Sequence, residues 1–226
     1  MTEDRLYKQI RDTLKNDFVP VKPLKEAWKR AFWIFPLTLF CIVFTLEVFH
    51  LRPDYLNFHL MELWGFILLQ VLACYFILSE SLKTGIPGSF VSPFRLTVLG
   101  VIGPVVFLIA SMLNYEINPS HPAAGQEWAM GMACISIVGG LGFLALLAGV
   151  LLSRSGLPFR AGTVGLLLGL SGGLTAEASW RLHCPFTSWD HVLVFHGGAI
   201  IILAAAGLAV GSYWKRRAAA RSSKLS

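Results

Sequence analysis

The stretch "AGTVGLLLGLSGGLTAEASWR", residues 161–181, decides the fold class. Its first 20 residues (161–180) contain only one charged side chain, and about 20 apolar residues are what an α-helix needs to cross a bilayer. Small residues recur at every fourth position: Ala161, Gly165, Gly169 and Gly173. This spacing predicts a helix whose small-residue face packs closely against another helix. Glu177 and Arg181 continue the same face, and a carboxylate in a membrane is expected to be paired and inward.

Five further blocks of the chain have the same apolar character. Of the 226 residues, 55% are hydrophobic and 14% are charged, whereas a soluble domain carries about 25% charge. The six blocks run over residues 31–49, 63–79, 96–113, 128–152, 161–180 and 192–214. Backbone groups in lipid must be hydrogen-bonded internally, and the alternation typical of a membrane β-barrel is absent. The sequence therefore predicts an all-α, polytopic membrane protein with six transmembrane helices.

The distribution of basic residues predicts the orientation of these helices. Seventeen of the 19 Lys and Arg residues lie in the two tails and in the second and fourth loops. Because Lys and Arg concentrate on the cytoplasmic side, both termini are expected in the cytoplasm. The chain then divides into a cytoplasmic segment (1–30), a transmembrane domain (31–214) and a basic tail (215–226). The net charge of +6 is explained by this topology and does not indicate nucleic-acid binding. Tryptophans near the span ends are expected in the membrane interface: Trp28, Trp64, Trp128, Trp180 and Trp214.

The N-terminal segment predicts a short amphipathic helix between Glu3 and Phe18. Apolar residues follow one another at spacing four: Leu6, Ile10, Leu14 and Phe18. Such a stripe must be covered by something. Packing on the protein's own loops, lying on the membrane surface and docking on a partner remain three alternatives. Pro20 and Pro23 then end the helix and provide an extended spacer before the membrane.

Polar chemistry concentrates on the predicted outer side, in and before "LHCPFTSWDHVLVFHGG" (182–198). Cys134 and Cys184 lie toward this side, and the small residues Gly142, Ala145 and Gly149 share the helical face of Cys134, so it should face the bundle. Three roles are open for the two cysteines: a disulfide or redox-active pair, a soft-metal site, or packing alone. The candidate metal ligands are Cys134, Cys184, His183, His191 and His196, with four methionines (Met61, Met112, Met130 and Met132) on the same side. Cys41 and Cys74 are interpreted as buried small residues.

The pattern "LHCP…H…FHG", the cysteine early in the fourth span, six spans, and "LKNDFVPVKPL" before the first span together resemble the NrsF family. These are multi-pass bacterial membrane proteins that act as anti-sigma factors for extracytoplasmic-function (ECF) sigma factors. The resemblance implies an inner-membrane location and a sigma factor held by the N-terminal segment, through Leu6, Ile10, Leu14, Phe18, Val19 and Pro20. It also implies that Cys134 and Cys184 take part in signal perception. His183 and His196 match the family pattern, and His191 is an addition to it.

The expected function is therefore a regulator and not an enzyme. The N-terminal segment would sequester an ECF sigma factor and release it when a periplasmic signal reaches the cysteine pair, in a redox-sensing stress response. No cofactor is expected beyond a transient thiophilic metal ion, and neither direct nucleic-acid contact nor a small-molecule substrate is expected. The alternative is a membrane redox or thiophilic-metal-binding protein that uses the outer Cys, His and Met side chains as its working site.

Overall fold

The structure is a computed structural model that describes residues 7, 8, 11, 25–52, 55, 60–86, 91–117, 119–153 and 160–222. Within these residues the chain is helical and contains no strand. The helices are α2 (Ala27–Ala31), α3 (Ile34–Val48), α4 (Leu60–Lys83), α5 (Pro93–Ile117), α6 (Glu127–Ser153), α7 (Ala161–Trp180), α8 (Trp189–His191), the π-helix η2 (Val192–Gly197) and α9 (Gly198–Ser222). The N-terminal stripe and its neighbours Val19 and Pro20 lie outside the described residues.

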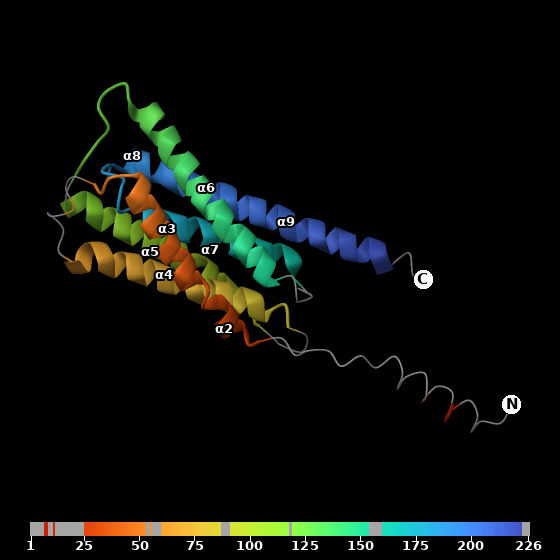
Figure 1. The fold of residues 1–226 in the computed structure, drawn as a ribbon. Helices are drawn as coiled ribbons and strands as arrows, with labels where there is room; N and C mark the ends of the chain where they lie inside the picture. The colour runs from red at the N-terminus through yellow and green to blue at the C-terminus, as the bar shows by residue number, and fades with distance from the viewer. Residues whose placement is uncertain are drawn as a thin grey trace.

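The long helices run back and forth along one bundle (Figure 1). At one end, here called the terminal end, α2 begins and α9 finishes. At the other end, here called the cysteine end, α3 and α5 finish, α6 begins and the short α8 lies. The chain thus enters and leaves the bundle from the same end, which is the arrangement that six alternating crossings require.

Helix α7 forms the centre of the bundle. Seventeen of its 20 residues are buried, and it packs against α3, α4, α5, α6 and α9. Leu168 and Leu174, both nearly inaccessible, belong to the main apolar core. A helix covered on every side meets neighbouring helices and not lipid, so it can carry glycine, serine and a charged pair.

Within the described residues, five helical segments are long and apolar enough to cross a membrane: Ala27–Val48, Trp64–Lys83, Pro93–Ile117, Glu127–Ser153 and Trp189–Arg217. These correspond to five of the six predicted spans. The remaining predicted span, α7, is present as a helix but is not among the five. Its glycines and polar residues lower its hydropathy, and its central position explains why that composition is tolerated.

The glycine face of α7 is a packing seam, as its spacing predicts. A Cβ atom on Gly165 would overlap the carbonyl oxygen of Gly207 in α9, and one on Gly207 would overlap that of Gly165. A Cβ atom on Gly169 would likewise overlap the Leu203 carbonyl oxygen, and a Cβ atom on Gly173 would overlap the backbone of Ile200. The two backbones approach so closely that only a missing side chain allows the contact.

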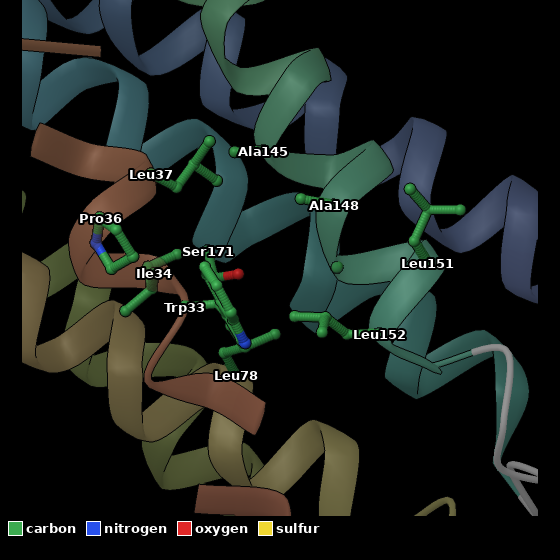
Figure 2. A pocket seen from close by; sticks show the side chains of 11 residues that line it. Trp33, Ile34, Pro36, Leu37, Leu78, Ala145, Ala148, Leu151, Leu152 and Ser171 are labelled. Carbon is green, nitrogen blue, oxygen red and sulfur yellow. The ribbon is translucent and has the colours of Figure 1, made fainter. Parts of the chain in front are cut away.

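A pocket of about 500 Å³ opens between α3 and α6 (Figure 2). Its walls are apolar, with Leu37 on one side and Ala148 and Leu152 on the other, and Ser171 of α7 behind them. None of the described residues that line it is titratable. The polar chemistry of the protein therefore lies elsewhere, at the cysteine end.

Candidate thiol and imidazole site

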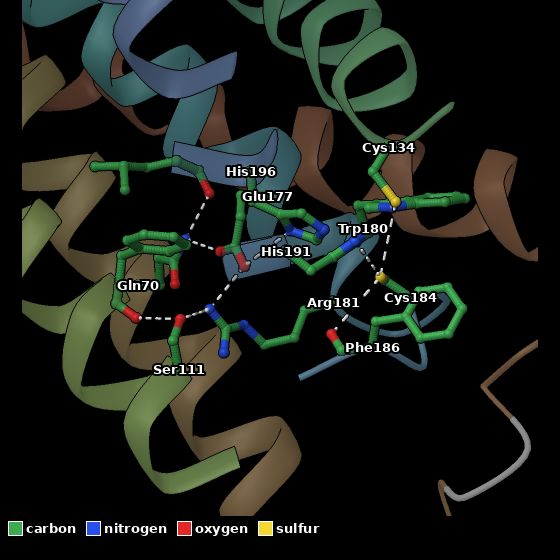
Figure 3. Close-up of polar contacts among 12 residues, drawn as sticks. Gln70, Ser111, Cys134, Glu177, Trp180, Arg181, Cys184, Phe186, His191 and His196 are labelled. Carbon is green, nitrogen blue, oxygen red and sulfur yellow. Dashed lines mark hydrogen bonds and ion pairs between the residues drawn. The ribbon is translucent and has the colours of Figure 1, made fainter. Parts of the chain in front are cut away.

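Four side chains from two separate parts of the sequence meet at the cysteine end of the bundle (Figure 3). Cys134 comes from α6, Cys184 from the loop between α7 and α8, His191 from the end of α8 and His196 from η2. One sulfur or nitrogen atom from each lies within 4.8 Å of the others, and all four residues are buried. We call this group the thiol–imidazole cluster.

The two sulfurs of the cluster are in contact without being bonded. The Sγ atoms of Cys134 and Cys184 are 3.7 Å apart, well beyond the disulfide length of about 2.05 Å. Burial and the contact with Cys134 affect the protonation of Cys184: the pKa of this thiol is raised, first by its hydrogen bond with Cys134 and then by burial, which disfavours the thiolate. Cys184 is therefore a protonated thiol at neutral pH in the absence of a cation.

The orientation of Cys134 follows its helical phase and confirms the prediction. The buried face of α6 contains Cys134, Val138, Gly142, Ala145 and Gly149. These residues recur at three- and four-residue intervals and therefore share one face of the helix. Cys134 projects from this face toward the loop after α7, which brings it to Cys184.

A π-helix brings the two histidines of the cluster together. His191 and His196 are five residues apart, and five residues of α-helix would separate them by about 140° around the axis. Residues Val192–Gly197 instead form a π-helix, in which hydrogen bonds join residues five apart and place them one above the other. The ring centroids of His191 and His196 are consequently 5.5 Å apart. Hydrophobic periodicity did not predict this segment, and His191 was only an addition to the family pattern.

Trp180 supports the cluster from inside the bundle and does not face outward as a residue of an interfacial belt would. Its side chain is buried, and the indole Nε1 donates a hydrogen bond to Cys134 Sγ at 3.3 Å. The tryptophan ends α7, the central helix, and the helices around α7 cover it. Trp28, Trp64 and Trp128 are exposed, as the prediction required.

Aromatic rings enclose the imidazole side of the cluster. The Phe186 ring lies 5.2 Å from His191 and the Phe195 ring lies 5.3 Å from it. Phe195 packs directly over Gly131 of α6, where any side chain would collide with the ring. These rings shield the cluster from bulk solvent, so its four polar side chains lie in contact with one another.

His183 lies beside the cluster but is not part of it. Its Nδ1 is 3.0 Å from the carbonyl oxygen of His50, and its Nε2 is 2.9 Å from the Thr45 hydroxyl. A carbonyl can only accept, so Nδ1 carries the proton and Nε2 accepts from Thr45. Burial lowers the pKa of His183, which favours this neutral form. The ring stacks on Trp180 at 5.4 Å and so helps to position the indole that contacts Cys134.

A buried ion pair adjoins the cluster, as the spacing of Glu177 and Arg181 predicts. Arg181 Nη2 is 2.6 Å from Glu177 Oε1, and both side chains are almost inaccessible. Gln70 of α4 donates to the second carboxylate oxygen at 2.5 Å, and Arg181 also donates to Ser111 of α5 at 3.3 Å. Glu177 Oε1 lies 3.8 Å from Nδ1 of His196, so the cluster is connected to α4, α5 and α7. Neither Gln70 nor Ser111 has a sequence signal that distinguishes it from other polar residues in spans.

Three of the four methionines expected near a soft-metal site point away from the cluster. Met112, Met130 and Met132 are each at least 40% exposed, and nothing is described of the Met61 side chain. Cys41 and Cys74 are fully buried, as expected, and neither belongs to the four-residue group. The structure therefore narrows the candidate ligands to two thiols and two imidazoles.

In its described residues the chain is all-helical, with helices long and apolar enough to span a membrane and a buried thiol–imidazole cluster at one end. The chain belongs to the NrsF family, described as "negative regulator of sigma F", whose family model matches residues 14–216. Searches among curated proteins and among solved structures gave no match. The family description is that of a regulator of a sigma factor, which agrees with the resemblance of the sequence.

Proposed function

We propose that this chain is an inner-membrane anti-sigma factor with six transmembrane helices and both termini in the cytoplasm. Its N-terminal segment (1–30) holds a sigma factor of the ECF type and releases it when a periplasmic signal reaches Cys134 and Cys184. The family description supports the sigma factor as partner. The observation that carries the sensory part is the contact of two buried thiols, 3.7 Å apart, at the end of the bundle opposite to the terminal end.

The energy that such a switch requires favours the thiols over the surface charges. Converting a mostly bound population to a mostly free one needs about 5.5 kcal/mol of difference between the two states. A surface ion pair contributes about 0–1 kcal/mol, whereas a covalent or metal event at two cysteines can supply the whole difference. A thiol oxidant would join the two sulfurs and accept two electrons and two protons, and a thiophilic cation would replace the thiol protons.

Contacts at the two ends of the bundle support the transmission of a signal between them. His196 contacts Glu177 on the central helix, and Glu177 contacts Arg181 and Gln70. At the terminal end, the guanidinium of Arg30 in α2 donates to the carbonyl oxygens of Leu82 and Leu152, which end α4 and α6. A shift of α4 or α6 would therefore reach α2, the helix at the end of the sigma-binding segment.

The docking step is tested by deleting residues 1–24, a boundary that keeps α2 and the Arg30 contacts intact. The truncated protein should insert into the membrane and lose capture of its sigma factor in a pull-down. Within the full chain, Ile10→Asp and Leu14→Asp should have the same effect, while Asn16→Asp, on the opposite side of the expected helix, should not. Capture of the sigma factor by the truncated chain would contradict the docking step.

The sensory step is tested with the double variant Cys134→Ser, Cys184→Ser. It should still hold the sigma factor but no longer release it on treatment with a thiol oxidant or a thiophilic metal. The matched control replaces the two buried cysteines outside the cluster, as Cys41→Ala and Cys74→Ala, and should respond normally. A normal response of the serine variant would remove the cysteine pair from signal perception.

The thiol–imidazole cluster also supports the alternative of a thiophilic-metal-binding membrane protein. Four buried Cys and His donors within 4.8 Å are the observation that favours it. A protein of that kind would hold its metal whether or not a sigma factor were present, and loss of the N-terminal segment would leave its activity unchanged. The truncation above separates the two functions.

A further inference from the structure

We propose that the thiol–imidazole cluster is a tetrahedral site for a divalent d¹⁰ cation, Zn²⁺, with Cys134, Cys184, His191 and His196 as its four ligands. This inference rests on the proposed function for its consequence, because it names what the sensory end of the protein binds. Four observations support the site: the arrangement of the donor atoms, their unsatisfied hydrogen bonding, the charge balance and the neighbouring carboxylate.

The distances between the donor atoms match the edges of a zinc tetrahedron. With Zn–S of about 2.3 Å and Zn–N of about 2.0–2.1 Å, tetrahedral angles separate two sulfurs by about 3.8 Å and a sulfur from a nitrogen by about 3.5 Å. The two Sγ atoms here are 3.7 Å apart, and Cys184 Sγ is 3.5 Å from His191 Nε2. Two of the six edges therefore have the length that zinc requires, and all four donor atoms lie within 4.8 Å of one another.

The imidazoles of the cluster have unused hydrogen-bonding capacity. Of the described buried polar atoms, Nδ1 of His191 and both ring nitrogens of His196 have no hydrogen-bond partner. His191 is 2% exposed and His196 is 3% exposed, so water does not compensate. Buried polar groups are normally satisfied, and a cation bound by imidazole nitrogens would remove part of this deficit.

A divalent ion fits the charge of this buried site. Zn²⁺ held by two thiolates and two neutral imidazoles forms a unit without net charge, and each thiol that ligates the ion releases its proton to solvent. A monovalent ion binding the same two thiolates would leave one uncompensated negative charge among apolar side chains, at a cost in solvation free energy. Glu177 and Arg181 already neutralise each other nearby.

Glu177 lies on the side of His196 where a zinc-bound histidine usually has its outer hydrogen bond, although the separation of 3.8 Å is longer than a hydrogen bond. Ligating histidines normally direct their second ring nitrogen to a carboxylate, a carbonyl or water, which fixes the orientation of the ring. Nδ1 of His196 faces Glu177 Oε1 at 3.8 Å, which leaves the other ring nitrogen for the ion. The exposed positions of Met112, Met130 and Met132 argue against a thioether-rich site for a monovalent soft ion.

An ion at this point would join separate elements of the bundle. Its ligands come from α6, from the loop after α7 and from the α8–η2 segment, and the aromatic rings of Phe186 and Phe195 close over it. Gain or loss of the ion would change how these elements are held together. This is the kind of event that the proposed release of the sigma factor requires.

The test uses the purified full chain, reduced and in mild detergent, loaded with Zn²⁺ alone. Elemental analysis should find about one zinc ion per chain, and substitution by Co²⁺ should give the visible bands and the thiolate charge-transfer bands of a tetrahedral site. Cys184→Ser and His196→Gln should each weaken zinc binding by at least about tenfold. His183→Gln is the matched control, because His183 is buried in the same region but directs its ring to Thr45 and His50, and it should bind zinc as the unaltered chain does.

A second measurement needs no variant and so does not depend on a variant's folding. All four cysteines are buried and react slowly, so the unaltered chain is exposed to a small alkylating agent for a long time. Zinc should then slow the alkylation of Cys134 and Cys184, as read by mass spectrometry, and should leave the alkylation of Cys41 and Cys74 unchanged. The metal site would be overturned by any of three results: no stoichiometric zinc, an octahedral cobalt spectrum, or unchanged zinc binding by His196→Gln.

The metal site and the proposed function can fail separately. If zinc binds but does not change how much sigma factor the chain retains, the sensory role fails and the metal site stands. If a thiol oxidant releases the sigma factor from a chain that binds no zinc, the metal site fails and the proposed function stands.

Discussion

Glu177 and Arg181 bury opposite charges on one helix, and neither is stable there without the other. Glu177 is 1% exposed and Arg181 is 5% exposed. Their contact, with the hydrogen bonds from Gln70 and to Ser111, compensates the loss of water around both groups. Removing one charge would leave the other uncompensated in a low-dielectric interior.

We predict that Glu177→Gln lowers the free energy of unfolding by about 3–5 kcal/mol, because it leaves the buried guanidinium of Arg181 without a counter-ion. Denaturant or thermal unfolding in detergent measures the change. Lys29→Gln breaks an ion pair with Glu26 whose side chains are more than half exposed, and it should change stability by no more than about 1 kcal/mol. Equal effects of the two substitutions would contradict this account.

The contact between α7 and α9 shows how the composition of one helix depends on its neighbour. The seam is built from glycine on both sides, with Gly165 and Gly169 facing Gly207 and Leu203. In lipid no hydrophobic effect drives two helices together, so close van der Waals contact provides the attraction. α9 in turn follows η2, so the position of the seam also influences where His196 lies.

We predict that Gly165→Ala destabilises the protein by about 1–3 kcal/mol or more, because the new methyl group overlaps the Gly207 carbonyl oxygen. The control is Gly140→Ala in α6, where a Cβ meets nothing within 4 Å. That substitution should be neutral or stabilising by up to about 1 kcal/mol, since alanine favours helix more than glycine does. Unfolding in detergent compares the two variants, and a neutral Gly165→Ala would show that the seam is not tightly packed.

At the scale of the whole molecule, the bundle separates two ends with different chemistry. The cysteine end holds the thiol–imidazole cluster, and the terminal end holds the start of α2 and the end of α9 (Figure 1). The central helix α7 passes between them and carries the charged pair close to the cluster. The proposed function requires the two ends to lie on opposite sides of a membrane.

We predict that a membrane-impermeant maleimide labels Ala124→Cys in intact cells and labels Lys8→Cys only after the membrane is permeabilised. Both positions are exposed, and Ala124 lies in the loop between α5 and α6. The four natural cysteines are buried and should give little background. Labelling of both positions from the outside would place the two ends in one compartment and would exclude signalling across the membrane.

Much of the fold follows from features that are local in the sequence. Apolar blocks of spanning length predict the helices, because a backbone in lipid must satisfy its own hydrogen bonds. Spacing by four residues predicts the glycine seam and the Glu177–Arg181 pair, because residues four apart share a helical face. The inward orientation of Cys134 follows from the same geometry, and the structure confirms all three.

The composition of the site was decided by the tertiary structure. The sequence shows that Cys184 follows the fifth apolar block and that three histidines lie near it, but not which of these side chains meet. The π-helix places His191 and His196 on one face. The two ring nitrogens of His183 instead form hydrogen bonds with the His50 carbonyl and the Thr45 hydroxyl. Trp180 became buried because α7 is surrounded by other helices. These outcomes depend on contacts between residues as many as 138 positions apart, and helical periodicity, which relates residues only a few positions apart, carries no information about them.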